Sequence, residues 1–170
     1  MNDESTMHGK RRPVGARQVF GHPAHLLAFG GGAGLSPVAP GTAGTLIGVV
    51  LYWFMQPLPL VLYLAITAVL FVAGVWLCGI TARNLGVHDH AGIVWDEIVG
   101  FLIAMIAVPR GWAWLAAGFV LFRLFDIWKP WPIRYLDRHV TGGFGVMLDD
   151  AVAALYALVI LQVLAQLPGS

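Results

Sequence analysis

Residues 18–82 form a stretch of 65 residues without a single aspartate, glutamate, lysine or arginine. The rest of the chain is nearly as apolar, since only 11% of its 170 residues are charged and 58% are hydrophobic. A typical soluble protein has about 25% charged residues. A soluble fold of this size has too little interior to bury so much apolar surface. The sequence therefore predicts an integral membrane protein and excludes a disordered, collagen-like, coiled-coil or disulfide-bonded chain.

The apolar sequence divides into five predicted helices, separated by proline, glycine and charged residues. They cover residues 42–55, 60–82, 93–108 and 112–128, and a last segment that begins at Asp149 and Asp150. Residues 30–45 read GGGAGLSPVAPGTAGT, which is typical of a loop, and the glycines in the polar residues 134–145 indicate irregular backbone. We therefore expect an all-α, multi-pass transmembrane bundle of about five helices, with a Gly/Pro-rich loop before the first.

The basic residues predict how this bundle lies in a membrane, because they concentrate on the cytoplasmic side. We expect residues 1–20 to be a disordered cytoplasmic tail and residues 21–170 to be a single transmembrane helical domain. If all five helices cross, nine of the ten basic residues lie at or near the cytoplasmic face, and only Arg110 lies outside. The net charge of +1 provides no basic stripe, so nucleic acid is not an expected partner.

This orientation gathers five acidic residues at one end of the bundle. They are Asp96, Glu97, Asp126, Asp149 and Asp150. Acidic residues inside apolar helices are costly and mark function by default. A role as helix N-terminal acids fits Asp149 or Asp150 singly, but not two adjacent pairs together with Asp126. Because carboxylate oxygens suit hard divalent cations, the set favours a metal site, and Mg²⁺ fits best if a phosphate completes its shell.

Two basic residues lie close to these acids. Arg123 and Lys129 each stand three residues from Asp126, on one helical face. An ion pair with Asp126 and a contact with a phosphate oxygen both remain open for Arg123. Residues 30–45 offer backbone N–H groups that could bind an anion, although they do not form a Walker loop.

Four motifs occur in order along the chain. They are GLSPVAPGTAGT (residues 34–45), GVHDHAGIVWDEIVG (86–100), FRLFDIWKPWPI (122–133) and DRHVTGGFGVMLDD (137–150). With these motifs the chain, from about residue 23 to residue 167, resembles the phosphatidylglycerophosphatase A family of bacterial membrane phosphatases. The resemblance implies Mg²⁺-dependent hydrolysis of the terminal phosphomonoester of phosphatidylglycerophosphate, which gives phosphatidylglycerol in phospholipid biosynthesis. It also implies a bacterial inner-membrane protein whose site faces the cytoplasm and whose partners are the bilayer and a phospholipid substrate.

The resemblance and the charge pattern together predict the roles of individual residues. The expected metal ligands are Asp96, Glu97, Asp149 and Asp150. The expected catalytic residues are Asp89, Arg123, Asp126 and Lys129. The expected substrate-binding residues are Thr42, Arg134, Asp137 and Arg138. Within this set, Arg123 and Lys129 are expected to neutralise the transferred phosphoryl group, and Arg134 and Arg138 to hold the inner phosphodiester.

A divalent-cation transporter is the alternative, because it would also gather acidic residues inside the membrane. Transporters place such residues near the midplane, often on repeated halves. Here the acids are expected at one end, and the sequence has no internal repeat. The D-G-x-x-A-R run of lipid head-group transferases and the P-S-G-H motif of histidine-based lipid phosphatases are both absent.

Overall fold

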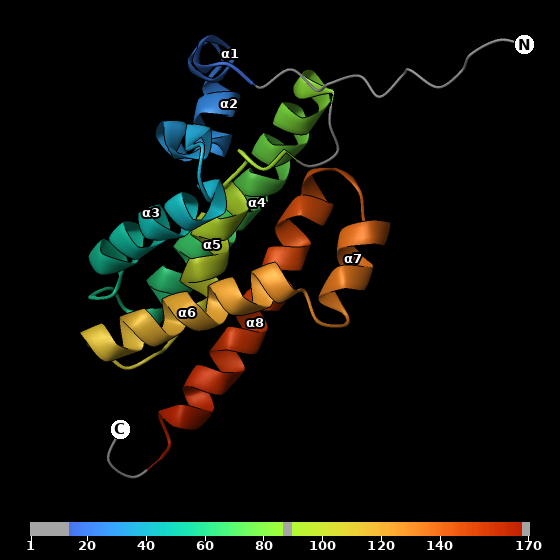
Figure 1. Cartoon of the computed structure of the whole chain (residues 1–170). Coiled ribbons are helices and arrows are strands. Elements are labelled where there is room, and N and C mark those ends of the chain that lie inside the picture. The colour runs from blue at the N-terminus through green and yellow to red at the C-terminus, as the bar shows by residue number, and fades with distance from the viewer. Residues whose placement is uncertain (1–13, 87–89, 168–170) are drawn as a thin grey trace, which may run out of the picture.

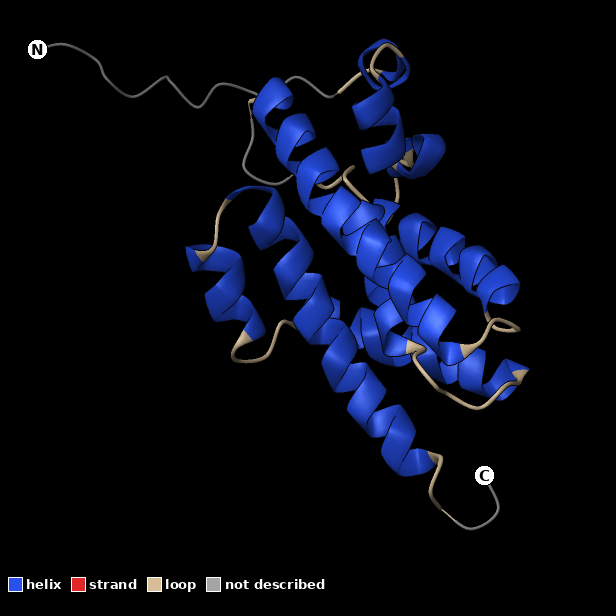
Figure 2. Ribbon diagram, turned by 180° about the vertical axis from the view of Figure 1, so that it is seen from behind, coloured by secondary structure: helices blue, strands red, loops and turns tan. Residues whose placement is uncertain are grey.

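The computed structural model describes residues 14–86 and 90–167, and every regular element in these ranges is a helix (Figures 1 and 2). In chain order the elements are α1 (Ala16–Phe20), α2 (Pro23–Ala28), the 3₁₀ helix η1 (Gly30–Leu35), α3 (Pro40–Met55), α4 (Leu60–Leu85), α5 (Trp95–Ala104), α6 (Trp112–Trp128), α7 (Ile133–His139) and α8 (Gly142–Leu164). The prediction of an all-α fold is confirmed for this part of the chain.

Among the described helices, α4 and α8 are long and apolar enough to cross a membrane. Their 26 and 23 residues extend over roughly 39 and 34 Å, which exceeds the hydrocarbon core of about 30 Å. With 16 and 17 residues, α3 and α6 are shorter than this thickness, and the ten residues of α5 extend over only about 15 Å. Two spans are thus supported, and the predicted number of five crossing helices is not confirmed.

Helix α8 packs against four other helices, α4, α5, α6 and α7 (Figure 1). Its contact with α4 is very close, because a Cβ on Gly143 would collide with the carbonyl oxygen of Val75 and lie 2.5 Å from the Gly79 nitrogen. One turn further, a Cβ on Gly74 would lie 2.6 Å from the sulfur of Met147. Small residues allow two helix backbones to approach in this way. The crossing holds the N-terminal part of α8 against α4.

The chain before α3 is more ordered than the sequence predicts. Val19 in α1 is fully buried, and the ring of His25 in α2 donates from Nδ1 to the carbonyl oxygen of Gln18 at 3.1 Å. The other ring nitrogen of His25 contacts the Asn84 amide of α4 at 3.1 Å. Residues 16–20 thus form a helix anchored by Val19, where the sequence predicts a disordered segment. Residues 1–13 lie outside the described residues.

Three further segments differ from the prediction. Residues 30–45 are not one loop, because they contain η1 and the first turn of α3. The segment 134–145 forms most of α7 and the start of α8, since Gly142 and Gly143 begin a helix instead of interrupting it. Asp149 and Asp150 consequently lie two turns inside α8. Helix α5 is shorter at both ends than the predicted residues 93–108, whereas α4 and α6 lie close to their predicted bounds.

Candidate active site

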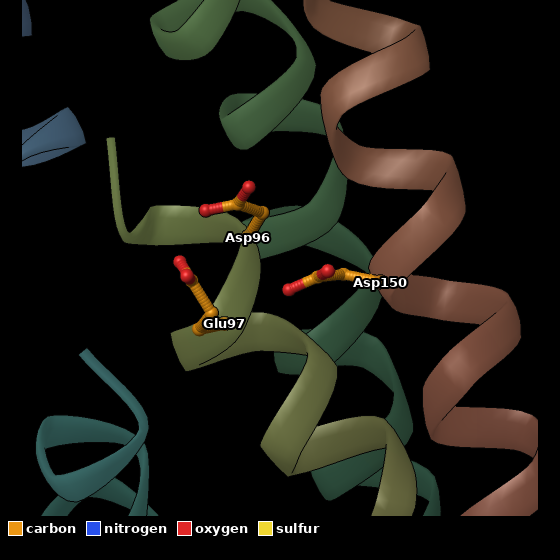
Figure 3. Close-up of side chains that lie close together, drawn as sticks. All are labelled: Asp96, Glu97 and Asp150. Atoms are coloured by element: carbon orange, nitrogen blue, oxygen red, sulfur yellow. The ribbon is translucent and has the colours of Figure 1, made fainter. Parts of the chain in front are cut away.

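Three carboxylates from two helices meet in the interior. Asp96 and Glu97 lie in the first turn of α5, and Asp150 lies on the face of α8 that packs against α5 (Figure 3). One oxygen atom from each of the three lies within 4.8 Å of the others. Asp96 and Asp150 are only 8% and 3% exposed. We call Asp96, Glu97 and Asp150 the carboxylate cluster.

The chemistry of the carboxylate cluster fits a divalent cation. Asp96 Oδ1, Glu97 Oε2 and Asp150 Oδ2 are buried and have no hydrogen-bond partner. Buried polar atoms are normally paired, and a buried charge without a counter-ion is strongly unfavourable. Oxygen ligands on anionic side chains are those that Mg²⁺ and Ca²⁺ prefer. The residues present therefore fit a hard divalent cation, and Mg²⁺ as that cation stays a prediction.

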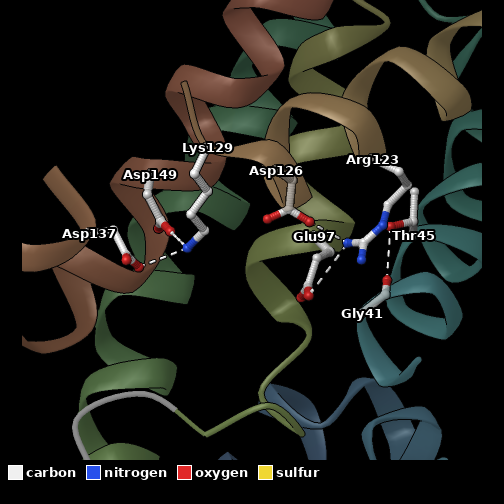
Figure 4. Close-up of polar contacts among 8 residues, drawn as sticks. All are labelled: Gly41, Thr45, Glu97, Arg123, Asp126, Lys129, Asp137 and Asp149. Atoms are coloured by element: carbon white, nitrogen blue, oxygen red, sulfur yellow. Dashed lines mark hydrogen bonds and ion pairs between the residues drawn. The ribbon is translucent and has the colours of Figure 1, made fainter. Parts of the chain in front are cut away.

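Arg123, near the end of α6, lies beside the cluster. Its Nη1 donates to Asp126 Oδ2 at 2.5 Å and lies 3.7 Å from Glu97 Oε1 (Figure 4). The Arg123 side chain is 14% exposed, and its Nε has no partner. Both of the roles left open for Arg123 by the sequence are compatible with this position, because the ion pair with Asp126 leaves Nε available.

Gly41, in the first turn of α3, completes this part of the site. A Cβ at Gly41 would collide with Glu97 Oε1 and lie 3.0 Å from Nη1 of Arg123. The fully buried Thr45 hydroxyl donates to the Gly41 carbonyl oxygen at 2.9 Å (Figure 4). Only glycine therefore leaves room for the Glu97 and Arg123 side chains against α3. Gly41 was not predicted, since a glycine in a Gly-rich motif offers no side-chain signal.

Lys129 joins α6 to α7 and α8 through two ion pairs. Its Nζ donates to Asp137 Oδ1 at 2.7 Å and to Asp149 Oδ2 at 2.6 Å (Figure 4). Burial lowers the pKa of Lys129, but the charges of Asp149 and Asp137 outweigh it and raise this pKa above its ordinary value. The Lys129 ammonium group therefore stays charged at any physiological pH.

The structure separates the four predicted metal ligands. Asp96, Glu97 and Asp150 lie together, whereas Asp149 turns to Lys129. Asp126 lies close enough to Glu97 and Asp150 for their charges to interact, so it borders the carboxylate cluster.

The other predicted residues lie nearby or fall outside the structure. Thr42 follows Gly41 in the first turn of α3. Asp137 contacts Lys129, and Arg134 and Arg138 line a cavity of about 460 Å³ beside α7. Asp89 lies outside the described residues, and its catalytic role stays a prediction.

Comparison with known proteins gives a consistent result. A family model described as phosphatidylglycerophosphatase A matches residues 26–165. An Escherichia coli (strain K12) protein named phosphatidylglycerophosphatase A is 49% identical to this chain over 147 residues, which are 86% of each chain. A Haemophilus influenzae protein of the same name is 49% identical over 144 residues, which are 82% of this chain and 86% of the relative. A Bacteroides thetaiotaomicron protein named "Putative phosphatidylinositol-3-phosphatase" is 39% identical over 146 residues, 81% of this chain and 91% of its own. No solved structure matches the chain.

Fold and site together define a class: an all-helical protein with a buried carboxylate centre and two helices that are long enough to span a membrane, one of which carries Asp150. Within this class, the chain belongs to the phosphatidylglycerophosphatase A family. The family resemblance stated from the motifs is thereby confirmed. The cation-transporter alternative finds no support, because the matching family and these relatives are named as phosphatases.

Proposed function

We propose that this protein hydrolyses the terminal phosphomonoester of phosphatidylglycerophosphate to phosphatidylglycerol and inorganic phosphate. The observation that carries the proposal is the carboxylate cluster with its unpartnered buried oxygens, in a chain with two relatives named for this activity. In the reaction, water adds to phosphorus, the bond from phosphorus to the glycerol oxygen breaks, and the glycerol oxygen leaves as the alcohol.

Asp96, Glu97 and Asp150 are the residues that would hold a Mg²⁺ ion. Bound there, the ion would supply charge neutralisation at the phosphoryl group and lower the pKa of a water molecule. Asp149 is assigned a different role from the one that the sequence predicts. Because it shares Lys129 with Asp137, it positions the Lys129 ammonium group beside the site.

Arg123 is the cation best placed for the transferred phosphoryl group. Its guanidinium group lies between Asp126 and Glu97 and packs against Gly41 in the first turn of α3. A guanidinium group binds two phosphate oxygens at once, and a buried one stabilises developing charge more strongly than an exposed one. Asp126 holds Arg123 in place until the phosphate arrives.

The inner phosphodiester of the substrate fits the cavity beside α7. Lys129, Arg134 and Arg138 line this cavity together with Trp128, Trp131 and Tyr135. The two tryptophans are 61% and 80% exposed, as is usual for side chains at a membrane interface. Lys129, one of the lining residues, also contacts Asp149 of α8, the helix that carries Asp150.

The proposal places the carboxylate cluster at the cytoplasmic face of a bacterial inner membrane. Phospholipid phosphates lie at the interface between hydrocarbon and water, so a site at one end of the bundle can receive the head group while the acyl chains stay in the bilayer. The basic residues of α7 and the end of α4 support this orientation.

Phosphate release from phosphatidylglycerophosphate by the purified protein in detergent tests the proposal. We expect release with Mg²⁺, none with EDTA, and recovery when Mg²⁺ is restored. Phosphatidic acid and phosphatidylinositol 3-phosphate, offered at the same concentration, measure selectivity. EDTA-resistant release would reject the metal role and keep the phosphatase, whereas no release from any of the three lipids would reject the phosphatase.

A further inference from the structure

A groove between α4 and α8 lies outside the site described above. It has a volume of about 610 Å³, and its lining includes Phe71, Val75, Trp76, Arg83 and Phe144. None of its lining residues lines the cavity beside α7. Both views place α7 on the opposite side of α8 from α4, so the groove and the α7 cavity flank α8 from two sides (Figures 1 and 2).

The groove is apolar along most of its length and cationic at one end. Val72, Trp76 and Phe144 are 69%, 63% and 50% exposed, although they belong to the two helices that can span a membrane. Arg83, at the C-terminal end of α4, makes no ion pair within the described part of the chain. An apolar groove with a cation at its end is complementary to an acyl chain that carries an anionic head group.

The length of the groove matches one leaflet of a bilayer. Phe71 and Arg83 are twelve residues apart on α4, or roughly 18 Å along the helix axis. Half of a hydrocarbon core is about 15 Å. A lipid whose phosphate meets Arg83 therefore has its acyl chain alongside Val75 and Phe71 within a single leaflet.

We propose that this groove binds one anionic glycerophospholipid as a resident lipid, separate from the substrate, with its phosphate at Arg83 and one acyl chain between α4 and α8. Asp150 and Phe144 lie on different faces of α8, because six residues turn a helix by about 240°. The bound lipid therefore fills the outer side of the α4–α8 crossing, while the carboxylate cluster occupies the inner side. This proposal does not depend on the enzymatic activity.

Lipid binding to the delipidated full-length protein, counted by native mass spectrometry, tests the inference. The probes are phosphatidylserine, which is anionic and is not a product of the proposed reaction, and phosphatidylcholine, which is zwitterionic. We expect phosphatidylserine to bind about fivefold more tightly than phosphatidylcholine, which corresponds to one Arg at a membrane surface. The variant Arg83→Gln should reduce this ratio to about one.

Two further variants separate the groove from general charge effects. Arg110→Gln removes an exposed arginine that contacts the Gln56 carbonyl oxygen, outside the groove, and should leave the ratio unchanged. Val72→Trp fills the groove and should weaken the binding of both lipids. An unchanged ratio in Arg83→Gln, or unchanged binding in Val72→Trp, would overturn the proposal. A third outcome would also overturn it. If Arg83→Gln raised the KM for phosphatidylglycerophosphate as much as it lowered the affinity for phosphatidylserine, the groove would be part of the substrate site.

Discussion

Asp149 and Asp150 are neighbours in the chain and have different surroundings. Successive residues of a helix point about 100° apart, so one carboxylate faces α5 and the other faces the end of α6. Asp150 meets Asp96 and Glu97, whereas Asp149 meets Lys129 at 2.6 Å. A pair of acids that the sequence presents as one unit thus divides into a candidate metal ligand and a partner for a cation.

The variants Asp150→Asn and Asp149→Asn should therefore differ in metal binding. We expect Asp150→Asn to lower the affinity for Mn²⁺, used as a spectroscopic substitute for Mg²⁺, by a factor on the order of a hundred. Asp149→Asn should keep the Mn²⁺ affinity within about threefold of that of the unmodified protein. Its turnover should fall, because Lys129 loses one of the two carboxylates that position its ammonium group. Electron paramagnetic resonance of free Mn²⁺ measures both affinities. Equal loss of Mn²⁺ binding in the two variants would contradict this division.

Arg123 and a bound cation share the Glu97 carboxylate, which leads to a second prediction. In Arg123→Gln, Glu97 loses a positive neighbour at 3.7 Å, so the affinity for Mn²⁺ should rise. At the same time kcat/KM should fall by a factor on the order of a hundred or more, because the transferred phosphoryl group loses a buried donor. The same Mn²⁺ titration and a phosphate-release assay measure the two effects. A fall in Mn²⁺ affinity would show that Arg123 supports the metal site and does not compete with the cation.

Gly41 yields a prediction about shape. In Gly41→Ala the new methyl group collides with Glu97 Oε1, so the carboxylate must move, and a displacement of about 1 Å can cost a hundredfold in rate. Gly15→Ala is the matched control, because a Cβ at Gly15 meets nothing within 4 Å. We expect a lower phosphate-release rate in Gly41→Ala than in Gly15→Ala, and thermal unfolding checks that both variants are folded. Normal phosphate-release rates in Gly41→Ala would show that the reaction tolerates a displaced Glu97 carboxylate.

At the scale of the elements, Lys129 connects three helices. It follows α6, contacts Asp137 in α7 and Asp149 in α8, and adopts a left-handed backbone conformation with φ of 46°, which is unfavourable for any residue except glycine. A glycine would adopt this backbone conformation at lower energy, so the presence of lysine is explained by the two ion pairs that its side chain makes. The two ion pairs hold the α6–α7 connection against the N-terminal part of α8.

Lys129→Gln should lower the free energy of unfolding by about 2 kcal/mol, because two part-buried carboxylates lose their cation. Since the pKa of Lys129 is raised in the folded protein, its contribution is fully present below the ordinary lysine pKa of about 10.4 and is lost only above it. The destabilisation measured by thermal unfolding should therefore be the same at pH 6 and pH 8.5. A large difference between these two pH values would assign the effect to another group.

The elements also show which features the sequence can predict. Pro59 marks the start of α4, and Lys129 with Pro130 marks the end of α6, so these boundaries follow from local signals, whereas α4 continues three residues past its predicted end at residue 82. The site at Asp96 and Glu97 follows from two acids in an apolar helix. The start of α8 does not follow, because glycines that usually interrupt helices are needed here for close packing against α4.

The division between Asp149 and Asp150 and the role of Gly41 could not be predicted either. Each depends on which helix face meets a neighbour, and a single sequence does not specify how α3, α5 and α8 are rotated against one another. The same reason applies to the length of α5. Its apolar composition continues past Ala104, but its last residues leave the helix to begin the turn toward α6.

At the scale of the whole molecule, the proposed orientation predicts opposite sides of the membrane for Arg110, in the turn before α6, and Arg138, in α7. Cys78 is buried, so a cysteine introduced at Arg110 or at Arg138 provides the accessible thiol. In intact spheroplasts a membrane-impermeant maleimide should label Arg110→Cys and not Arg138→Cys, and opening the membrane should expose the second. Labelling of Arg138→Cys from outside would reverse the orientation.

The close glycine contact between α4 and α8 lies near the N-terminal end of α8, which sets how far each part of α8 would move if the helix tilted about it. Asp150 lies seven residues beyond Gly143, or about 10 Å along the axis, whereas Leu164 lies about 31 Å away at the end that extends past the other helices (Figure 1). When α8 tilts to match a thinner or thicker bilayer, its distal end sweeps about three times as far as Asp150. A tilt about this contact would displace the carboxylate cluster much less than the C-terminal end of α8, so we expect metal binding at the cluster to vary little with membrane thickness.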